Sequence, residues 1–122
     1  MCVLPFPNMS GDPEQEYFSD GISEEIITDL NKVSALEVMS RNTAFAYKGK
    51  QMDASEIARK LKVTHVLEGS VRRAGGRVRI TAPLTDATND RQVWAERFDR
   101  DTDDIFALQD EISHAIVKAL RL

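Results

Sequence analysis

The chain has 122 residues, a formal net charge of −4 and a single cysteine. This length suits one domain with a core of its own, and the acidic balance does not favour general binding to nucleic acid. One cysteine excludes an internal disulfide and a multi-cysteine metal site. No apolar run approaches the roughly 20 residues that cross a bilayer, and no segment has the pattern of a signal peptide.

The first half of the chain predicts two strand–helix units. Residues 2–6 form a short apolar strand, and residues 8–11 have the composition of a turn. Asp12 is suited to cap a helix that begins at Pro13, and apolar residues recur at helical spacing from there to Val33. Three further elements are expected: a strand at residues 36–39, a polar loop at residues 40–52 and a helix at residues 53–61 that Asp53 caps.

Residues 63–100 predict three consecutive antiparallel strands. Gly75 and Gly76 form a two-residue hairpin loop, so the pairing counts outward from Ala74 opposite Arg77. Because side chains alternate along a strand, this register places an apolar set on one face. That set comprises Leu67, Gly69, Val71, Val78, Ile80, Ala82 and Leu84.

After a polar turn at residues 86–92, the third strand has Trp94 and Phe98 on one face, and residues 102–122 form the last helix. The order is therefore β-α-β-α-β-β-β-α. It predicts a single α/β domain over residues 1–122, with a five-stranded mixed sheet in a three-layer sandwich. Both chain ends fall inside predicted elements, so we expect the domain to be excised from a longer multidomain protein.

Two groups of polar residues are candidates for a ligand site. Asn8, Ser10 and Asp12 follow the first strand and Arg41 follows the second, where ligands favour the carboxyl ends of parallel strands. The polar hairpin face carries three more candidates, Glu68, Arg72 and Arg79. An anion or polar metabolite would suit this set, and the alternative is ordinary turn and cap chemistry with solvated Arg–Glu pairs.

No catalytic constellation is recognisable in the chain. Lys48-Gly49-Lys50 lacks the glycine spacing of a phosphate-binding loop. The acidic run from Asp99 resembles half of a calcium loop, but the required Gly and Glu are missing and helix capping explains it. We predict no catalytic residue, no metal and no cofactor.

Four segments resemble the TolB N-terminal-like (FlgO-like) domain: residues 3–30, 41–50, 63–87 and 93–112. The resemblance implies a three-layer α/β domain with a five-stranded mixed sheet. Such domains occur in bacterial adenylate/guanylate cyclase proteins, often beside tetratricopeptide (TPR) repeats, with the cyclase chemistry in a different domain. The resemblance also draws attention to Gly11, Tyr47, Lys48, Gly49 and Gly69.

The function predicted first is a non-catalytic regulatory or protein-interaction domain of a larger bacterial signalling protein, an adenylate/guanylate cyclase. A small-ligand sensor is the alternative, and an enzyme in its own right is a third hypothesis. Expected partners are the cyclase or TPR domains of its own chain, another protein, a small ligand or further copies. Neither nucleic acid nor direct membrane insertion is expected, and the cytoplasmic and periplasmic sides of a membrane-anchored parent both stay open.

Overall fold

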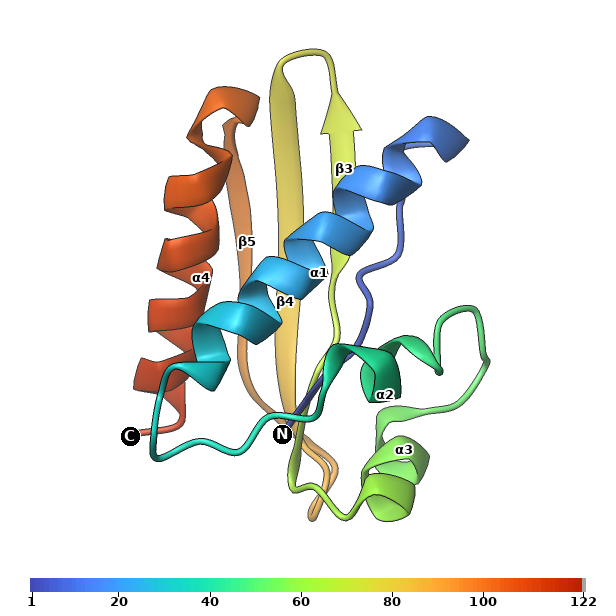
Figure 1. Ribbon diagram of the computed structural model, residues 1–122, viewed down its shortest axis with the longest axis vertical. Helices are drawn as coiled ribbons and strands as arrows, with labels where there is room; N and C mark the ends of the chain where they lie inside the picture. Colours follow the sequence, from blue (N-terminus) through green and yellow to red (C-terminus); the bar gives the residue numbers. More distant parts are fainter. Residues whose placement is uncertain (122) are drawn as a thin grey trace.

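The computed structural model describes residues 1–121 and forms one mixed sheet with helices (Figure 1). The strands are β1 (Cys2–Val3), β2 (His65–Leu67), β3 (Ser70–Ala74), β4 (Arg77–Asp86) and β5 (Arg91–Asp101). The helices are α1 (Glu16–Asn31), α2 (Arg41–Phe45), α3 (Ala54–Leu61) and α4 (Ile105–Ala119). Short 3-10 turns at Pro13–Gln15 and Thr102–Asp104 lead into α1 and α4. The predicted α/β class and five-stranded mixed sheet are confirmed.

Strand β4 organises the sheet, because it pairs antiparallel with β2, β3 and β5. Strand β1 pairs parallel with β2 and makes the sheet mixed. The hairpin register is the predicted one, with Ala74 opposite Arg77 and Arg72 opposite Arg79. The predicted apolar face is buried at Leu67, Val71, Val78, Ile80, Ala82 and Leu84.

The predicted strand at residues 36–39 is wrong. The nitrogen of Met1 donates to the Glu37 carbonyl oxygen at 2.9 Å, and Met39 N–H donates to the Met1 carbonyl oxygen at 2.9 Å. The segment therefore runs beside the first residue of the chain and joins no strand. The fifth strand arises elsewhere, because the chain predicted as one strand is divided into β2 and β3 at Glu68 and Gly69.

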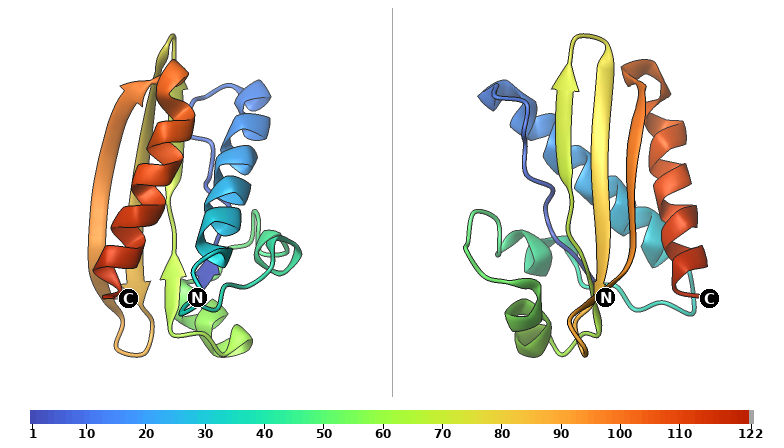
Figure 2. Two further views of the ribbon diagram at one scale, coloured as in Figure 1. Left: turned by 60° about the vertical axis from the view of Figure 1, so that its left-hand side comes forward. Right: turned by 180° about the vertical axis from the view of Figure 1, so that it is seen from behind.

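Helices α1 and α4 cover one face of the sheet (Figure 2). As predicted, Asp12 caps the first helical turn, and its Oδ1 accepts a hydrogen bond from Glu14 N–H at 3.0 Å. The buried stripes also match the predicted helical spacing: Ile22, Ile26 and Leu30 in α1, and Leu108, Ile112 and Ile116 in α4. The last helix was predicted to reach residue 122, which lies outside the described residues.

A buried serine joins α1 to the extended segment after β1. Phe6 N–H donates to Ser23 Oγ at 2.8 Å, and this hydroxyl donates to the Ser19 carbonyl oxygen at 3.1 Å. Phe6 and Ser23 are both buried. The pair fixes where the first helix crosses the sheet, since a buried N–H needs a partner.

Helix α2 lies in the region predicted as a polar loop. Ser40 caps it, since its Oγ accepts a hydrogen bond from Thr43 N–H at 3.3 Å. The Arg41 guanidinium lies 4.2 Å from the centre of the Phe45 ring. A helix of five residues is too short to show a helical period in the sequence.

Helix α3 supplies the third layer at one end of the sheet. Its Ala54 and Ala58 pack on Val66, which alternates with Leu67 and so faces the other side of β2. Asp53 caps this helix as predicted, with Oδ1 accepting from Glu56 N–H at 2.8 Å. Within residues 1–121, no helix covers this side of β3, β4 and β5 (Figure 2). None of the helices there has both the length and the apolar character that crossing a membrane requires.

Candidate functional site

The uncovered side of β3, β4 and β5, here called the open face, carries a regular grid of side chains. Three cross-strand rows follow from the strand registers. They are Ala74–Arg77–Asp101, Arg72–Arg79–Asp99 and Ser70–Thr81–Arg97. Arg79 and Thr81 are the central residues of the last two rows. They alternate along β4 with buried Val78 and Ile80, so their side chains lie on the side away from the core. The open face therefore concentrates arginines at the hairpin end of the sheet.

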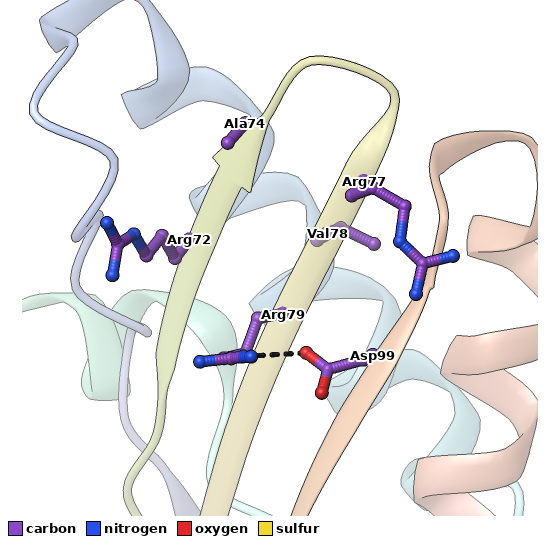
Figure 3. A pocket seen from close by; sticks show the side chains of 6 residues that line it. All are labelled: Arg72, Ala74, Arg77, Val78, Arg79 and Asp99. Carbon is purple, nitrogen blue, oxygen red and sulfur yellow. Dashed lines mark hydrogen bonds and ion pairs between the residues drawn. The ribbon is translucent and has the colours of Figure 1, made fainter.

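A shallow depression of about 460 Å³ lies on the open face near the hairpin. Its lining residues are Arg72, Ala74, Arg77, Val78, Arg79 and Asp99 (Figure 3). Arg79 Nε donates to Asp99 Oδ1 at 2.6 Å, and Arg77 Nη1 donates to Asp101 Oδ1 at 2.8 Å. The hydrogen bond from Arg79, together with nearby arginine charge, holds the pKa of Asp99 below its usual range.

Arg72 differs from its neighbours on the open face. Figure 3 shows its side chain pointing away from the Arg79–Asp99 pair. Among residues 1–121 it has no carboxylate within ion-pair distance, whereas Arg97 Nε lies 3.8 Å from Asp99 Oδ2. The open face thus carries four arginines, Arg72, Arg77, Arg79 and Arg97, but only the two aspartates Asp99 and Asp101. It carries net positive charge on a chain whose net charge is −4.

The structure does not bring the predicted site residues together. Asn8, Ser10 and Asp12 share one loop and bond within it or to β3. Asn8 Nδ2 donates to the Asp12 carbonyl oxygen at 2.7 Å, and Ser10 Oγ accepts from Arg73 N–H at 2.8 Å. The depression beside this loop is lined by Asp12 and Glu16 and by no cation, which does not suit an anion.

Arg41 lies apart from the loop at residues 8–12. Its Nε is 3.1 Å from Glu24 Oε1, and it belongs to α2, which Figure 1 shows far from the start of α1. Arg41 lies apart from this loop because the strand predicted at residues 36–39 does not form. Residues 36–39 run beside Met1, so Arg41 follows at the level of the start of β1, whereas Asn8 comes several residues later along the sheet.

Glu68 lines a separate groove of about 370 Å³. This groove lies between residues 4–7 and the loop after α2, and it also contains Tyr47, Lys48, Gly49 and Gly69. These are positions that the family resemblance singled out in distant parts of the sequence. The predicted pairing of Glu68 with the hairpin arginines is wrong, because Arg79 pairs with Asp99 instead.

Lys48 holds the loop after α2 against α1. Its Nζ lies 2.7 Å from Asp20 Oδ2 and 2.8 Å from Glu16 Oε2. The hydrogen bonds to Asp20 and then Glu16 raise the pKa of Lys48. With two carboxylates bound, Lys48 acts as a structural anchor of the groove wall.

Two further side chains with reactive groups are Cys2 and His65. The thiol of Cys2 is buried in the core, and desolvation raises its pKa to about 11, which disfavours the nucleophilic thiolate. His65 is half-buried, and its Nδ1 lies 2.8 Å from Thr64 Oγ1. Within residues 1–121, no group of three or more His, Cys, Asp or Glu side chains is placed to hold a metal ion.

Sequence reasoning missed Arg77, Arg97, Asp99 and Asp101 as members of the open face. The pairing of β4 with β5 contains an irregularity between Leu84 and Thr85. Because of it, counting outward from the turn at residues 86–92 does not give the register. The alternation of Arg97, Asp99 and Asp101 in the sequence indicates that the three side chains share one face of a strand. The register with β4 was also required to place them beside Arg77 and Arg79.

Comparisons with known proteins give a family and a fold. Residues 1–115 match the family model described as "HilA/YgeH-like transcriptional regulator, second domain". The chain is 60% identical, over its whole length, to a protein named "Putative adenylate cyclase 3" from Rhizobium meliloti (strain 1021). It spans only 21% of that relative.

Two solved structures share the fold. TolB from Acinetobacter baumannii matches with a TM-score of 0.69 at 17% identity, over 98% of this chain and 28% of TolB. A PelC dodecamer from Paraburkholderia phytofirmans matches with a TM-score of 0.63 at 18% identity, over 98% of this chain and 86% of PelC. The predicted likeness to TolB is confirmed at the level of the fold.

Proposed function

Because the chain belongs to the family of HilA/YgeH-like transcriptional regulator second domains, we propose that it is a non-catalytic regulatory domain acting through protein contacts. The parent we propose is a bacterial adenylate/guanylate cyclase. The relative named as an adenylate cyclase is about five times longer than the matched region, which leaves room for a separate catalytic domain. The cyclase domain, TPR repeats or a separate protein would then be the partner.

The open face is the observation that carries this proposal. Sheets in α/β domains are usually covered on both sides, yet most of this face lacks a helix within residues 1–121. Exposed arginine is also one of the residue types enriched at protein interfaces. A basic face on an acidic domain would select a partner surface rich in carboxylates.

Contact through the edge of the sheet is less suitable than contact through the open face. The edge that continues from β1 carries Pro5 and Pro7, which have no N–H to donate to an added strand. At the other edge, β5 carries charged side chains such as Glu96 and Arg97, which discourage strand pairing. The expected partner contact is therefore made by side chains of the open face.

Exchange of the matching segment in the longer relative tests this function. We would replace that segment with this chain, either unchanged or carrying Arg72→Glu and Arg79→Gln, and measure cyclic-nucleotide output in purified protein. The altered face is expected to change the output by about fivefold or more, the scale of typical coupling between sites. Arg59→Glu on α3 is the matched control, since it changes an exposed arginine away from the open face.

Two results would overturn the proposal. One is an output that is insensitive to the altered face and to removal of the whole segment. The other is cyclic-nucleotide synthesis by the isolated chain supplied with ATP or GTP, because the domain would then be catalytic.

A small-anion sensor is a second candidate, favoured by the depression between Arg72, Arg77 and Arg79. A phosphate or carboxylate bound there would pair with Arg72. Binding to the native state raises the melting temperature, so thermal shift with millimolar phosphate and dicarboxylates is the test. No stabilisation of the wild type, or equal stabilisation of Arg72→Glu, would count against this site.

A further inference from the structure

Two large apolar side chains are exposed at the starts of the two long helices. Tyr17 in the first turn of α1 is 90% exposed, and Phe106 in the first turn of α4 is 74% exposed. Tyr17 falls on the side of α1 opposite the buried Ile26, so it projects straight away from the sheet. Exposed aromatic residues with no partner inside the domain are typical anchors of protein contacts.

Exposed acidic residues come shortly before both aromatic residues in the chain. Asp12 and Glu14 precede Tyr17, and Asp103 and Asp104 precede Phe106; all four are exposed. Residues 12–31 contain seven Asp or Glu and no Lys or Arg. Among residues 1–121, Glu16 and Asp20 bind Lys48, Glu24 binds Arg41 and Asp29 pairs with Lys32. The acids of this stretch outside any ion pair are therefore Asp12, Glu14 and Glu25, and two of these three lie at the helix start.

The open face has the opposite charge at the same end of the molecule. Figure 1 shows that α1 and α4 both begin at the end where the β3–β4 hairpin turns, and the arginines lie on the strands just below that turn. A second copy stacked in the same orientation would set its acidic helix starts over the arginines. One of its exposed aromatic side chains, Tyr17 or Phe106, would then face the depression of about 460 Å³.

We propose that the open face binds the helix starts of a second copy of this chain. Glu14 and the aspartates before α4 pair with Arg72, Arg77 and Arg79 of the neighbour, while Tyr17 or Phe106 enters the depression against the guanidinium groups. The proposal rests on the proposed function, since it names the partner of the open face. The neighbour's helices then supply the layer that the domain lacks over β3–β5.

The contact joins two different surfaces of the same molecule. Such an interface leaves a free open face at one end of a pair and free helix starts at the other. Association therefore continues to larger assemblies, or closes into a ring when the rotation between copies allows it. Because two different surfaces meet, two variants that each lack one of them can still bind each other, which is not expected for a symmetric dimer.

The test uses two variants, each lacking one half of the contact. Arg72→Glu with Arg79→Gln disables the open face, and Tyr17→Ala, Phe106→Ala and Glu14→Lys together disable the helix starts. Each variant alone is expected to associate about tenfold more weakly than wild type in sedimentation velocity at low salt. Mixed together, they are expected to form a 1:1 dimer that grows no further, because each offers one intact surface.

Controls separate loss of the contact from loss of the fold. Circular dichroism and urea unfolding report whether each variant is folded, and Arg59→Glu is expected to associate like wild type. Association is also expected to weaken with added salt, since exposed charges are screened.

A monomeric wild type at ~1 mM, where even weak specific contacts populate, would overturn the proposal. So would variants that fail to complement each other while staying folded. Either result would overturn self-association alone. The proposed regulatory function would still hold if the exchanged segment in the longer relative controls cyclic-nucleotide output. An unaffected output with intact self-association would instead overturn the regulatory function alone.

Discussion

Gly69 occupies a point where the sheet leaves no room for a side chain. A Cβ there would lie 2.7 Å from the Thr81 carbonyl oxygen and 2.8 Å from the Phe6 ring. We expect Gly69→Ala to lower the free energy of unfolding by about 1–3 kcal/mol, because backbone and ring must both move. Gly76→Ala is the matched control, since open space surrounds that position. Equal urea midpoints for the two variants would contradict this account.

The hydroxyl of Ser23 is the only hydrogen-bond partner the structure gives to the buried Phe6 N–H. We expect Ser23→Ala to lower the free energy of unfolding by about 1–3 kcal/mol, because the donor is left unpaired in the core. Thr28→Ala removes a comparable bond on the same helix, from Thr28 Oγ1 to the Glu24 carbonyl oxygen at 3.0 Å, but at an exposed site. Urea unfolding should show little change for Thr28→Ala, and a similar loss in both variants would refute the role of Ser23.

Local pattern predicted some residues well and others poorly. The two cap residues Asp12 and Asp53 act as expected, because a cap bonds to an N–H only two or three positions away. Asn8, Ser10 and Arg41 were expected to share a site and do not, since that required the placement of a strand that does not form. The local role of a residue could be predicted from the sequence, but which distant residues lie beside it in the fold could not.

At the scale of elements, the hairpin and the two long helices follow from the sequence. A two-glycine turn fixes the register of β3 and β4, and both strands agree on the apolar face. Helix α2 and the division between β2 and β3 do not follow, because each depends on packing against distant segments. The sequence contains no period that marks them.

The loop after α2 depends on one lysine for its position. We expect Lys48→Met to lower the free energy of unfolding by about 0.5–1 kcal/mol at neutral pH, the usual range for a partly exposed ion pair. Folding raises the pKa of Lys48, so its stabilisation is complete below the ordinary value of 10.5 and is lost as pH rises through the higher folded value.

Urea unfolding at several pH values checks the role of Lys48. The gap between wild type and Lys48→Met should close in strongly alkaline solution. Lys50→Met in the same loop is the control, since Lys50 lies over the Tyr47 ring and takes part in no ion pair of residues 1–121. A gap that persists unchanged at high pH would argue that the methylene stem, and not the charge, stabilises the loop.

At the scale of the whole molecule, charge is divided between two surfaces. The helix starts are acidic and the open face is basic, and Asp99 moderates the open face by pairing with Arg79. We expect Asp99→Asn to strengthen self-association in low salt, because it removes one of two negative charges that compete with a partner's carboxylates. The difference should vanish near ~0.5 M salt, where screening is strong. Sedimentation velocity across a salt series checks it, and weaker association of the variant at low salt would contradict the model of opposed charge.

The sequence by itself determined the α/β class, the hairpin register and the buried stripes of α1 and α4. These depend on turns and on periods of two or about 3.6 residues, which are local. Only the tertiary structure decided that Arg79 pairs with Asp99, that Glu68 lies in a groove with Tyr47, and that β3–β5 keep one face open. Each of these joins residues far apart in the chain, so the packing of whole elements sets them.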